Sequence, residues 1–464
     1  FNYADRSNCA HHLYLGDGLY LDILMFWELL TYGLTILISI GIVFYYWRSG
    51  AKKSKAVAAK VEQAQEEGRF QPISLHPYID PSRCIGSGAC VTACPEEDIL
   101  GLIDGKATLI NSTSCIGHSA CFIACPVDAI SLKIGTEARG VDLPHIKPNY
   151  ESNIEGIFIA GELGGMGLIK NSAEQGIQAC DNLAKELPGE KSCALDICII
   201  GAGPAGIAAA LKATELGLSF RILDQESVGG TVATFPRDKV VMTKAMELPL
   251  YGKLKLTNTS KDELMGIWMD ILDRHQIEVE EFSKVQRIEA LGPYHFKLEV
   301  EAKEHLECRA VIIAIGRRGS PRKLGIPGED SQKVAYRLLE PEHIQNKKIL
   351  VVGGGDSAVE AALMLKDQNE VTLSYRKEHF SRIKKGNHLQ LQAAMEAGDI
   401  IPLLQSNLQI IEEHSVTLKD RDGQMLEIEN DKVFIFAGGE LPIPFLKESG
   451  INVERTFGKT MRKH

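Results

Sequence analysis

The stretch Asp196-Ile-Cys-Ile-Ile-Gly201-Ala-Gly203-Pro-Ala-Gly206 decides the fold of the larger part of this chain. Its apolar first half predicts a short buried strand, and the run from Ile207 to Leu216 predicts the helix that follows. The three glycines let the turn tighten, let the backbone approach a pyrophosphate and let the helix pack on the strand. The pyrophosphate would lie at the N-terminal end of this helix, where unpaired N–H groups attract anions. The pattern therefore predicts an α/β dinucleotide-binding unit.

A second unit of the same kind follows the first. In the first unit, the next expected strand ends at Asp224, which is suitably placed to bind a ribose hydroxyl. The second unit has an apolar strand ahead of Gly353-Gly354-Gly355-Asp356-Ser357, but its next strand ends in Arg376 and Lys377, with no acid. A carboxylate there would repel a 2′-phosphate, whereas arginine accommodates it, so these residues favour NADPH over NADH.

One cysteine-containing phrase occurs twice ahead of these units. The first copy is Cys84-Ile-Gly-Ser87-Gly-Ala-Cys90-Val-Thr-Ala-Cys94-Pro95, and the second is Cys115-Ile-Gly-His118-Ser-Ala-Cys121-Phe-Ile-Ala-Cys125-Pro126. Thiolates are soft, charged ligands that suit iron held in a sulfide cage. The spacing resembles that of the bacterial two-cluster ferredoxins over about Pro77 to Lys133, although Ser87 and His118 stand where each copy should have its second cysteine.

This resemblance implies two iron–sulfur clusters, with one cysteine of each phrase crossing to the other cluster. One ligand set would be Cys84, Cys90 and Cys125, and the other would be Cys94, Cys115 and Cys121. Three alternatives stay open for the missing ligand: a [3Fe–4S] cluster without it, a [4Fe–4S] cluster ligated by Ser87 or His118, or an exogenous ligand. Because neutral imidazole carries less negative charge than thiolate, the His118 side is expected to hold the higher-potential cluster. A scaffold that has lost its metal is a further alternative, but it would not need six thiols at cluster spacing.

A hydrophobic segment near the N-terminus predicts one membrane span. The uncharged stretch from Leu29 to Trp47 is 19 residues long, about the length that crosses a bilayer. Directly after it come the basic residues Arg48, Lys52, Lys53, Lys55 and Lys60. By the positive-inside rule, this predicts a single-pass protein of the cell membrane with a large cytoplasmic C-terminal part. A signal peptide is the alternative, but the stretch is long for one and lacks a preceding basic region.

The two dinucleotide loops, with Ala314-Ile-Gly316 between them, resemble the two-dinucleotide-binding flavoproteins of the thioredoxin-reductase type. Gly229-Gly230-Thr231 is similar to the low-molecular-weight disulfide reductase branch of that family. The resemblance implies an FAD site made by Gly201, Gly203, Gly206, Asp224, Gly230 and Thr231. It likewise implies a site for NADPH, or NADH, made by Gly353, Gly355, Asp356, Ser357, Arg376 and Lys377.

The chain departs from this family in two ways. The family's redox-active C-x-x-C, expected near Tyr336 to Glu340, is absent from that stretch, so the flavin must exchange electrons with something other than that pair. The C-terminal segment that contacts FAD in the family has its best match ahead of the first glycine loop, at Gly156-Ile-Phe-Ile-Ala-Gly161-Glu162. We therefore predict a circular permutation in which Val141 to Leu187 completes the FAD domain, with Gly161 and Glu162 at the cofactor.

Together these patterns predict an α/β protein with two Rossmann-like domains, preceded by a ferredoxin-like α+β domain and a transmembrane helix. The expected domains are an outer tail (1–20), a transmembrane helix (21–47), a cytoplasmic stalk helix (48–72), a two-cluster ferredoxin-like domain (73–137), an FAD-binding domain (138–335 with 430–464) and an NAD(P)H-binding domain (336–429). The net charge of −10 argues against a nucleic-acid partner.

The expected activity is electron transfer between NAD(P)H, FAD, the two clusters and a membrane-associated partner such as a quinone or a cytochrome subunit. Flavin suits the middle position, because it exchanges two electrons with nicotinamide and single electrons with iron–sulfur clusters. Two alternatives remain: an NADPH-dependent reductase of a small disulfide or a ferredoxin, and a non-catalytic assembly subunit.

Overall fold

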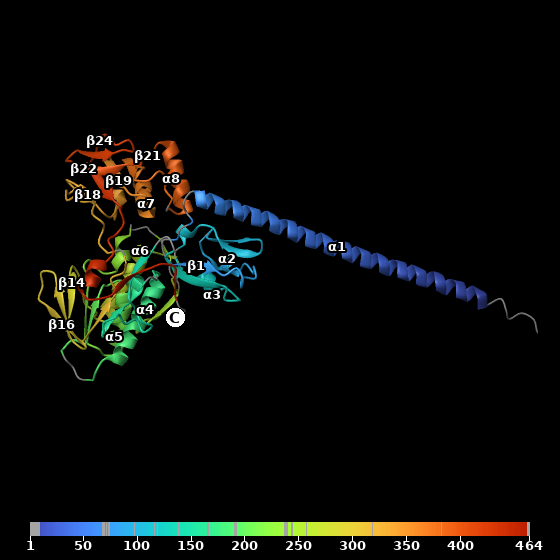
Figure 1. The fold of residues 1–464 in the computed structure, drawn as a ribbon, viewed down its shortest axis with the longest axis horizontal. Coiled ribbons are helices and arrows are strands. Elements are labelled where there is room, and N and C mark those ends of the chain that lie inside the picture. Colours follow the sequence, from blue (N-terminus) through green and yellow to red (C-terminus); the bar gives the residue numbers. More distant parts are fainter. Residues whose placement is uncertain are drawn as a thin grey trace, which may run out of the picture.

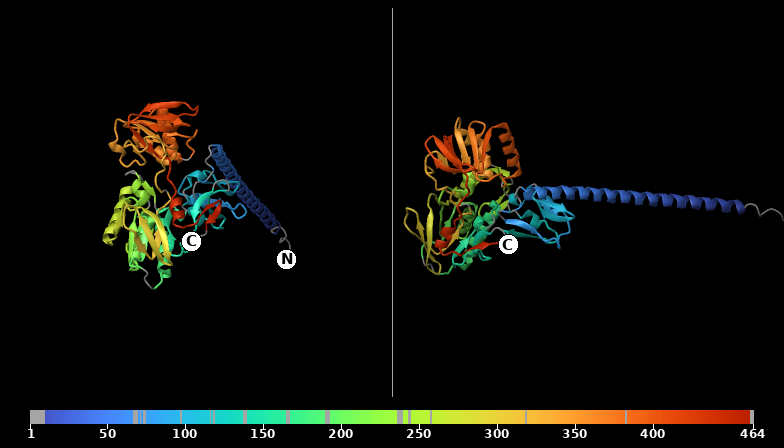
Figure 2. Two further views of the ribbon diagram at one scale, coloured as in Figure 1. Left: turned by 60° about the vertical axis from the view of Figure 1, so that its left-hand side comes forward. Right: turned by 45° about the horizontal axis from the view of Figure 1, so that its top comes forward.

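The computed structural model describes residues 10–66, 70, 72, 75–96, 98–115, 117, 119–136, 140–164, 167–189, 193–235, 240–242, 245–256, 258–317, 319–381 and 383–461. One long helix stands away from three domains, and the cysteine-rich domain lies at its base beside the flavin domain (Figure 1). The NADPH domain forms a separate lobe next to the flavin domain (Figure 2).

The long helix α1 runs from Ala10 to Glu66 without interruption. Its sequence contains no proline, and its 57 residues extend for about 85 Å at about 1.5 Å per residue. From Met25 onward it is long and apolar enough to cross a membrane, and none of the described residues buries its apolar window. The predicted span and most of the predicted stalk are therefore one continuous helix, which also takes in part of the predicted outer tail.

The cysteine-rich domain is built around an antiparallel strand pair. Its elements are β1 (Leu75–Ile79), α2 (Ala89–Ala93), β2 (Leu100–Ile103), β3 (Lys106–Leu109), η1 (Ser112–Ser114), α3 (Ala120–Ile123) and β4 (Ile130–Ile134). β1 pairs with β4, from Leu75 opposite Ile134 to Ile79 opposite Ile130. β2 and β3 form a hairpin whose two turn residues, Asp104 and Gly105, both have positive φ. Such a turn matches the twist of the strands that it joins.

The flavin domain has a five-stranded parallel sheet in the order β13-β8-β7-β17-β6. These strands are β6 (Ile157–Ile159), β7 (Ile197–Ile200), β8 (Phe220–Leu223), β13 (Val279–Glu280) and β17 (Ala310–Ile313). Because β6 precedes the first glycine loop and still pairs with β17, the prediction that this segment completes the sheet is confirmed.

The other elements of the flavin domain surround this sheet. They are β5 (Val141–Pro144), η2 (Gly161–Gly164), α4 (Ile169–Glu186), α5 (Pro204–Glu215), η3 (Gly230–Thr234), β9 (Val240–Met242), β10 (Met246–Leu248), β11 (Gly252–Leu254), β12 (Asn258–Ser260), α6 (Lys261–Arg274), β14 (Val285–Gly292), β15 (His295–Val300) and β16 (Leu306–Cys308). Helices α4 and α5 pack closely, since a Cβ at Gly176 would lie 2.0 Å from the carbonyl oxygen of Ala205. The permuted segment is thus part of the flavin domain's core.

The NADPH domain has a second parallel sheet, in the order β18-β25-β19-β20-β21. Its elements are β18 (Val334–Ala335), η4 (Pro341–His343), β19 (Lys348–Val352), α7 (Asp356–Leu365), β20 (Glu370–Tyr375), α8 (Lys385–Ala397), β21 (Ile400–Leu404), β22 (Asn407–Ile411), β23 (Ser415–Lys419), β24 (Met425–Glu429) and β25 (Lys432–Ile435). The domain is larger than predicted: β18 and β25, expected in the flavin domain, pair with each other in this sheet. The structure therefore places these strands on the other side of the predicted boundaries at 335 and 430. Strands this short have no sequence pattern that shows which sheet they join.

The C-terminal segment pairs with strands of both the flavin domain and the cysteine-rich domain. It contains α9 (Ile443–Glu448), β26 (Val453–Thr456) and β27 (Lys459–Met461). β26 pairs with β5, while β27 pairs with β4 and so adds a third strand to the cysteine-rich domain. The prediction assigns this whole segment to the flavin domain, but β27 pairs with the cysteine-rich domain, a backbone pairing that no sequence pattern indicates.

Candidate redox sites

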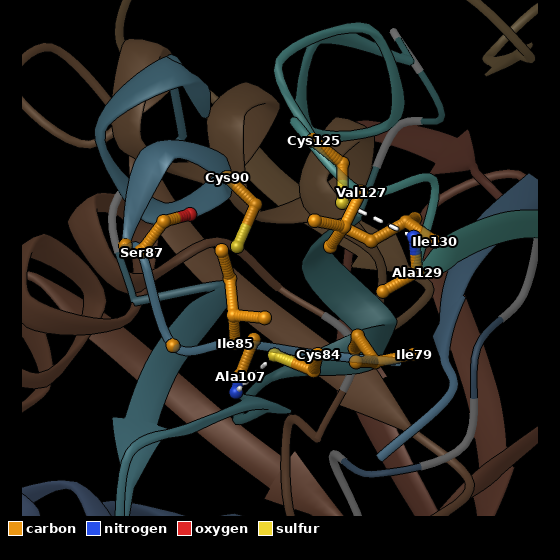
Figure 3. Close-up of a pocket in the computed structure, with 12 residues that line it drawn as sticks. Ile79, Cys84, Ile85, Ser87, Cys90, Ala107, Cys125, Val127, Ala129 and Ile130 are labelled. Carbon is orange, nitrogen blue, oxygen red and sulfur yellow. Dashed lines mark hydrogen bonds between the residues drawn. The ribbon is translucent and has the colours of Figure 1, made fainter. Parts of the chain in front are cut away.

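The first cysteine site is a small, partly open pocket in the cysteine-rich domain. Cys84 and Cys90 from the first phrase and Cys125 from the second line it together (Figure 3). The backbone N–H of Ala107 donates to the sulfur of Cys84 at 3.4 Å, and that of Ala129 donates to the sulfur of Cys125 at 3.2 Å. The structure thus brings together the three cysteines that the crossover arrangement assigns to one cluster, although their role as ligands stays a prediction.

The loop around Ser87 closes one side of this cavity. Ser87 is exposed and lies beside Cys90 (Figure 3). The loop is pressed against the β2–β3 hairpin, since a Cβ at Gly86, where φ is +72°, would lie 2.0 Å from the carbonyl oxygen of Gly105. Ser87 is therefore placed at the cavity as predicted, while His118 lies outside the described residues.

The second cysteine site contains Cys94, Cys115 and Cys121. Burial raises the pKa of all three thiols, and the nearby Cys115 and Cys94 add to the effect of burial at Cys121, whose pKa rises to about 12. Protein surroundings alone therefore disfavour thiolates here, and iron would supply the missing positive charge. This grouping, too, is the one that the crossover predicts.

Each group of three cysteines suits a cluster, in which each thiolate ligates a different iron. Among the described residues, no group of three His, Cys, Asp or Glu side chains forms a site for a single metal ion. Backbone N–H groups directed at two sulfurs of the first site also fit a bound cluster, since such hydrogen bonds tune its potential.

The first glycine loop is shaped by close backbone contacts. A Cβ at Gly206 would lie 1.8 Å from the carbonyl oxygen of Gly201, and a Cβ at Gly201 would lie 2.6 Å from that of Ala314. At Gly203, by contrast, a Cβ would meet no atom within 4 Å, which leaves open space at the N-terminus of α5. The loop therefore has tight packing at its two ends and room for a pyrophosphate in its middle.

Asp224 lies beside this loop and is almost buried. Its carboxylate accepts hydrogen bonds from the backbone N–H groups of Ala202, at 2.6 Å, and Glu226, at 2.8 Å. Burial raises the pKa of its carboxyl group, and these two hydrogen bonds oppose that effect. Since each carboxylate oxygen can accept a second hydrogen bond, the predicted contact with a ribose hydroxyl is compatible with this geometry.

The other predicted flavin residues surround the same loop. A Cβ at Gly230, at the start of η3 beside Thr231, would lie 3.2 Å from the Cα of Gly203. A Cβ at Gly161 would lie 3.1 Å from the Cβ of Ala205, which places η2, with Glu162, next to α5. The sequence missed Gln175, which is buried and accepts a hydrogen bond from the N–H of Gly161 at 2.9 Å. No motif marks a glutamine that orders a turn in this way.

The second glycine loop is covered by an aromatic ring. A Cβ at Gly354 would lie 2.1 Å from the ring of Tyr375, which itself stacks on Phe380 at 5.2 Å between centroids. At Gly355 a Cβ would meet no atom within 4 Å, so the N-terminus of α7 is open. Asp356 accepts hydrogen bonds from the N–H of Lys384 and the amide of Asn387, at 2.8 and 2.7 Å.

The basic residues predicted for the cosubstrate lie directly after β20. Arg376 and Lys377 are both exposed, and Ser357 is exposed in the first turn of α7. Because the N–H of Gly353 donates to the carbonyl of Ser374 at 2.9 Å, the glycine loop and the end of β20 are adjacent. The structure thus brings these predicted residues to one edge of the sheet.

Sequence reasoning also missed a contact between the two dinucleotide domains. Arg337 forms an ion pair with Glu226, which follows the flavin-domain strand β8. Arg337 lies between Tyr336 and Glu340, the stretch that corresponds to the family's C-x-x-C. Tyr336, next to it, donates a hydrogen bond to Glu329 at 2.8 Å. This stretch therefore connects the two domains through a salt bridge, and it has no thiol chemistry.

The two glycine loops and the cysteine-rich domain together define a flavin-dependent oxidoreductase with an iron–sulfur domain. Residues 198–461 match the family described as pyridine nucleotide-disulphide oxidoreductase, and residues 76–126 match the 4Fe-4S dicluster domain. The first match covers more than half of the chain, so the chain belongs to that family. Its cofactors are accordingly FAD, NADPH and iron–sulfur clusters.

Several individual relatives each match a little more than half of this chain. A ferredoxin–NADP reductase of Thermus thermophilus is 30% identical over 274 residues, which are 56% of this chain and 78% of the relative. The bacilliredoxin reductase Bdr of Bacillus subtilis is 26% identical over 266 residues, covering 56% of this chain and 82% of the relative. Among solved structures, the bacillithiol disulfide reductase Bdr of Staphylococcus aureus has 24% identity and a TM-score of 0.49, and the alignment covers 57% of this chain and 85% of that one.

Proposed function

We propose that this chain is a membrane-anchored oxidoreductase that moves electrons between NADPH, FAD, its two iron–sulfur clusters and a redox partner in the membrane. The observation that carries the proposal is the position of the cysteine-rich domain between α1 and the flavin domain (Figure 1). In this arrangement the clusters lie on the way from the flavin to the membrane, where a quinone or a cytochrome subunit could exchange electrons. The same arrangement serves either direction of electron flow.

Contacts with α1 support this position. Lys60 pairs with Asp98 at 2.5 Å, and Ser54 donates a hydrogen bond to Asp104 at 3.1 Å. Val57 packs between them, since a Cβ at Gly101 would lie 2.6 Å from its side chain. Ala64 is almost fully buried. The helix that would leave the membrane is thus fixed to the domain that would hold the clusters.

Contacts on the other side of the domain join it to the flavoprotein. β27 extends the sheet of β1 and β4, and β26 pairs with β5, which leads directly into the flavin domain. The C-terminal segment is thus held to the flavin domain by the β26–β5 pairing and to the cysteine-rich domain by the β27–β4 pairing, in addition to the covalent link between β4 and β5. Such a connection favours electron transfer inside one chain over capture of a diffusing ferredoxin.

A reductase of a small disulfide or of a separate ferredoxin is the second candidate. It is favoured by the names of the relatives, which include bacilliredoxin reductase and ferredoxin–NADP reductase. The absence of cysteine between Tyr336 and Glu340 removes the family's usual dithiol, so a disulfide would have to react directly at the flavin. The chain's own cysteine-rich domain is the simpler acceptor.

The test is anaerobic titration of the full chain in lipid vesicles with NADPH, followed by flavin absorbance and EPR spectroscopy. We expect the flavin to bleach and at least one iron–sulfur signal to change with it. Cys90→Ala should abolish the signal of the first site, whereas Cys193→Ser, which alters a cysteine outside both phrases, should leave all signals in place. Bleaching of the flavin without any change in the clusters would overturn the proposal in favour of the small-substrate reductase.

A further inference from the structure

The two cysteine sites lie at different distances from the membrane end of α1. The tip of the β2–β3 hairpin contacts α1 through reciprocal hydrogen bonds of 3.1 Å, from the Ser54 hydroxyl to Asp104 and from the Asp104 N–H to Ser54. Ser54 follows Trp47, the end of the uncharged stretch, by about seven residues, or about 10 Å of helix. The hairpin tip is therefore near the bilayer surface if the uncharged stretch spans the membrane.

The first cysteine site is built on this hairpin tip. The loop that begins at Cys84 lies against it, with the Cβ position of Gly86 only 2.0 Å from the carbonyl oxygen of Gly105. Lys106 donates from its ammonium group to the carbonyl of Cys84 at 2.6 Å, and the N–H of Ala107 donates to the sulfur of Cys84. Cys84 and its site are thus at the end of the domain that faces along α1 toward the membrane.

The second site is at the opposite end of the β1–β4 pair. The sulfur of Cys115 lies 3.7 Å from the carbonyl oxygen of Leu75, the first residue of β1. The last residue of β1, Ile79, and its partner Ile130 line the first site. The length of β1, four steps of about 3.4 Å or about 14 Å, therefore separates the two sites.

The second site also faces the flavin domain. Phe122, next to Cys121, packs in a cluster of apolar side chains that includes Val141 and Leu143 of β5. Shortly after β5, the side chain of Ile146 reaches to 3.1 Å from the Cβ position of Gly164, at the end of η2. Since η2 carries the predicted flavin residues Gly161 and Glu162, one short segment joins the second cysteine site to the flavin site.

We infer that the two cysteine sites have fixed and different places: the site of Cys94, Cys115 and Cys121 faces the flavin, and the site of Cys84, Cys90 and Cys125 faces the membrane and its redox partner. This inference rests on the proposed function, because it uses the membrane span of α1. It goes further in assigning the exchange with the membrane partner to the site that carries Ser87. The departure from the ferredoxin pattern at Ser87 then concerns the membrane-facing cluster.

The experiment measures the distance of each cluster from the lipid surface. The full chain is reconstituted into vesicles that contain a gadolinium-chelating lipid, and electron spin relaxation of each cluster is compared with vesicles that carry diamagnetic lanthanum. Ser87→Cys identifies the first site, because a fourth thiolate changes the signal of that cluster and leaves all six cysteines in place. If Ser87→Cys changes no signal, loss of a signal together with its iron in Cys90→Ala makes the same assignment.

We expect gadolinium to shorten the relaxation time of the signal assigned to the Ser87 site more than that of the other cluster. A larger effect on the other cluster would overturn the inference. Failure of the proposed function is recognised separately. If NADPH reduces neither cluster although the relaxation difference is found, the electron pathway is wrong and the placement of the sites stands. If the chain does not float with vesicles, both the proposed function and the placement of the two sites are wrong.

Discussion

The two dinucleotide loops have similar sequences and opposite surroundings. In the first, Gly206 is packed against the carbonyl of Gly201 and the following acid, Asp224, is almost buried. In the second, Ala358 takes the place of the third glycine, and the residue after the strand is the exposed Arg376. The acid that follows the first loop is therefore enclosed, as suits a retained cofactor, whereas the base that follows the second loop is accessible to a cosubstrate that enters and leaves.

The largest effect is expected from Gly206→Ala, which tests whether the first loop depends on close packing. The new Cβ would lie 1.8 Å from the carbonyl oxygen of Gly201, which cannot move unless strand β7 moves with it. We therefore expect a loss of more than about 3 kcal/mol in stability and loss of bound flavin. Gly203→Ala is the matched control: its Cβ meets no protein atom within 4 Å, so it should keep the melting temperature but weaken flavin binding. Thermal unfolding and flavin content measure both, and equal melting temperatures for the two variants would contradict the comparison.

Gly354→Ala makes the corresponding change in the second loop. Its Cβ would meet the ring of Tyr375 at 2.1 Å, and that ring has Phe380 stacked on it. Because a ring shifts more easily than backbone, we expect a smaller loss, about 2 kcal/mol, confined to the NADPH domain. Flavin content should stay normal while the KM for NADPH rises. Gly355→Ala, with open space around its Cβ, should preserve stability, and a full loss of flavin in Gly354→Ala would refute the independence of the two loops.

Arg376→Gln tests the difference in charge between Asp224, which follows β8, and Arg376, which follows β20. A charge-assisted hydrogen bond to the 2′-phosphate contributes about 1.5 to 2 kcal/mol, so kcat/KM for NADPH should fall about tenfold to thirtyfold. The value for NADH, which has no such phosphate, should hardly change. Arg421→Gln, an exposed arginine elsewhere in the NADPH domain, serves as the control. Equal losses with NADPH and NADH would show that Arg376 does not read the phosphate.

The smallest effect is expected from Arg337→Gln, which removes the ion pair with Glu226 between the two dinucleotide domains. Both side chains are about one-third exposed, so the pair adds less than about 1 kcal/mol to stability. The expected change is in domain orientation, seen as a broader distance distribution in small-angle scattering or in pulsed EPR between the domains. Glu340→Gln, which alters an exposed acid of the same stretch, should not have this effect. An unchanged distribution in Arg337→Gln would mean that the two linkers, the chain segments that cross between the domains, set the orientation without this ion pair.

Those linkers are the other connection between the two domains. The N–H of Arg322 donates to the carbonyl of Gly438 at 2.9 Å, and the N–H of Glu440 donates to that of Ser320 at 2.8 Å. The two chain segments that cross between the domains are therefore hydrogen-bonded to each other and form one double connection. Because the two segments are hydrogen-bonded to each other, the domains can move relative to one another only when both segments bend together.

Much of the fold was predictable because it depends on local patterns. The strand, glycine loop and helix around Gly201 and around Gly353 are visible in consecutive residues, and the resemblance of Gly156 to Glu162 to a displaced segment identified the strand β6. The grouping of Cys84 and Cys90 with Cys125 was likewise predictable, because the spacing carries the crossover of a known family.

The contacts that the sequence did not reveal are long-range and lack a motif. β18 and β25 are short strands whose sheet is decided by neighbours far away in the chain, which displaced the predicted domain boundaries. The ion pair of Arg337 with Glu226 and the hydrogen bond from the N–H of Gly161 to Gln175 connect polar residues of ordinary type. No periodicity marks such residues, since their roles arise only when the domains are assembled.

The pairing of β27 with β4 also has a consequence for biosynthesis. β4 lies more than 300 residues ahead of β27, so the middle strand of the cysteine-rich domain has one open edge until β27 has been synthesised and has left the ribosome. Domains generally fold in the order of their synthesis, but this one can reach its final sheet only after both dinucleotide domains exist. Maturation of the iron–sulfur sites and completion of the flavoprotein are thereby coupled, and a nascent chain that fails to fold downstream leaves its cysteine-rich domain with an unpaired edge exposed.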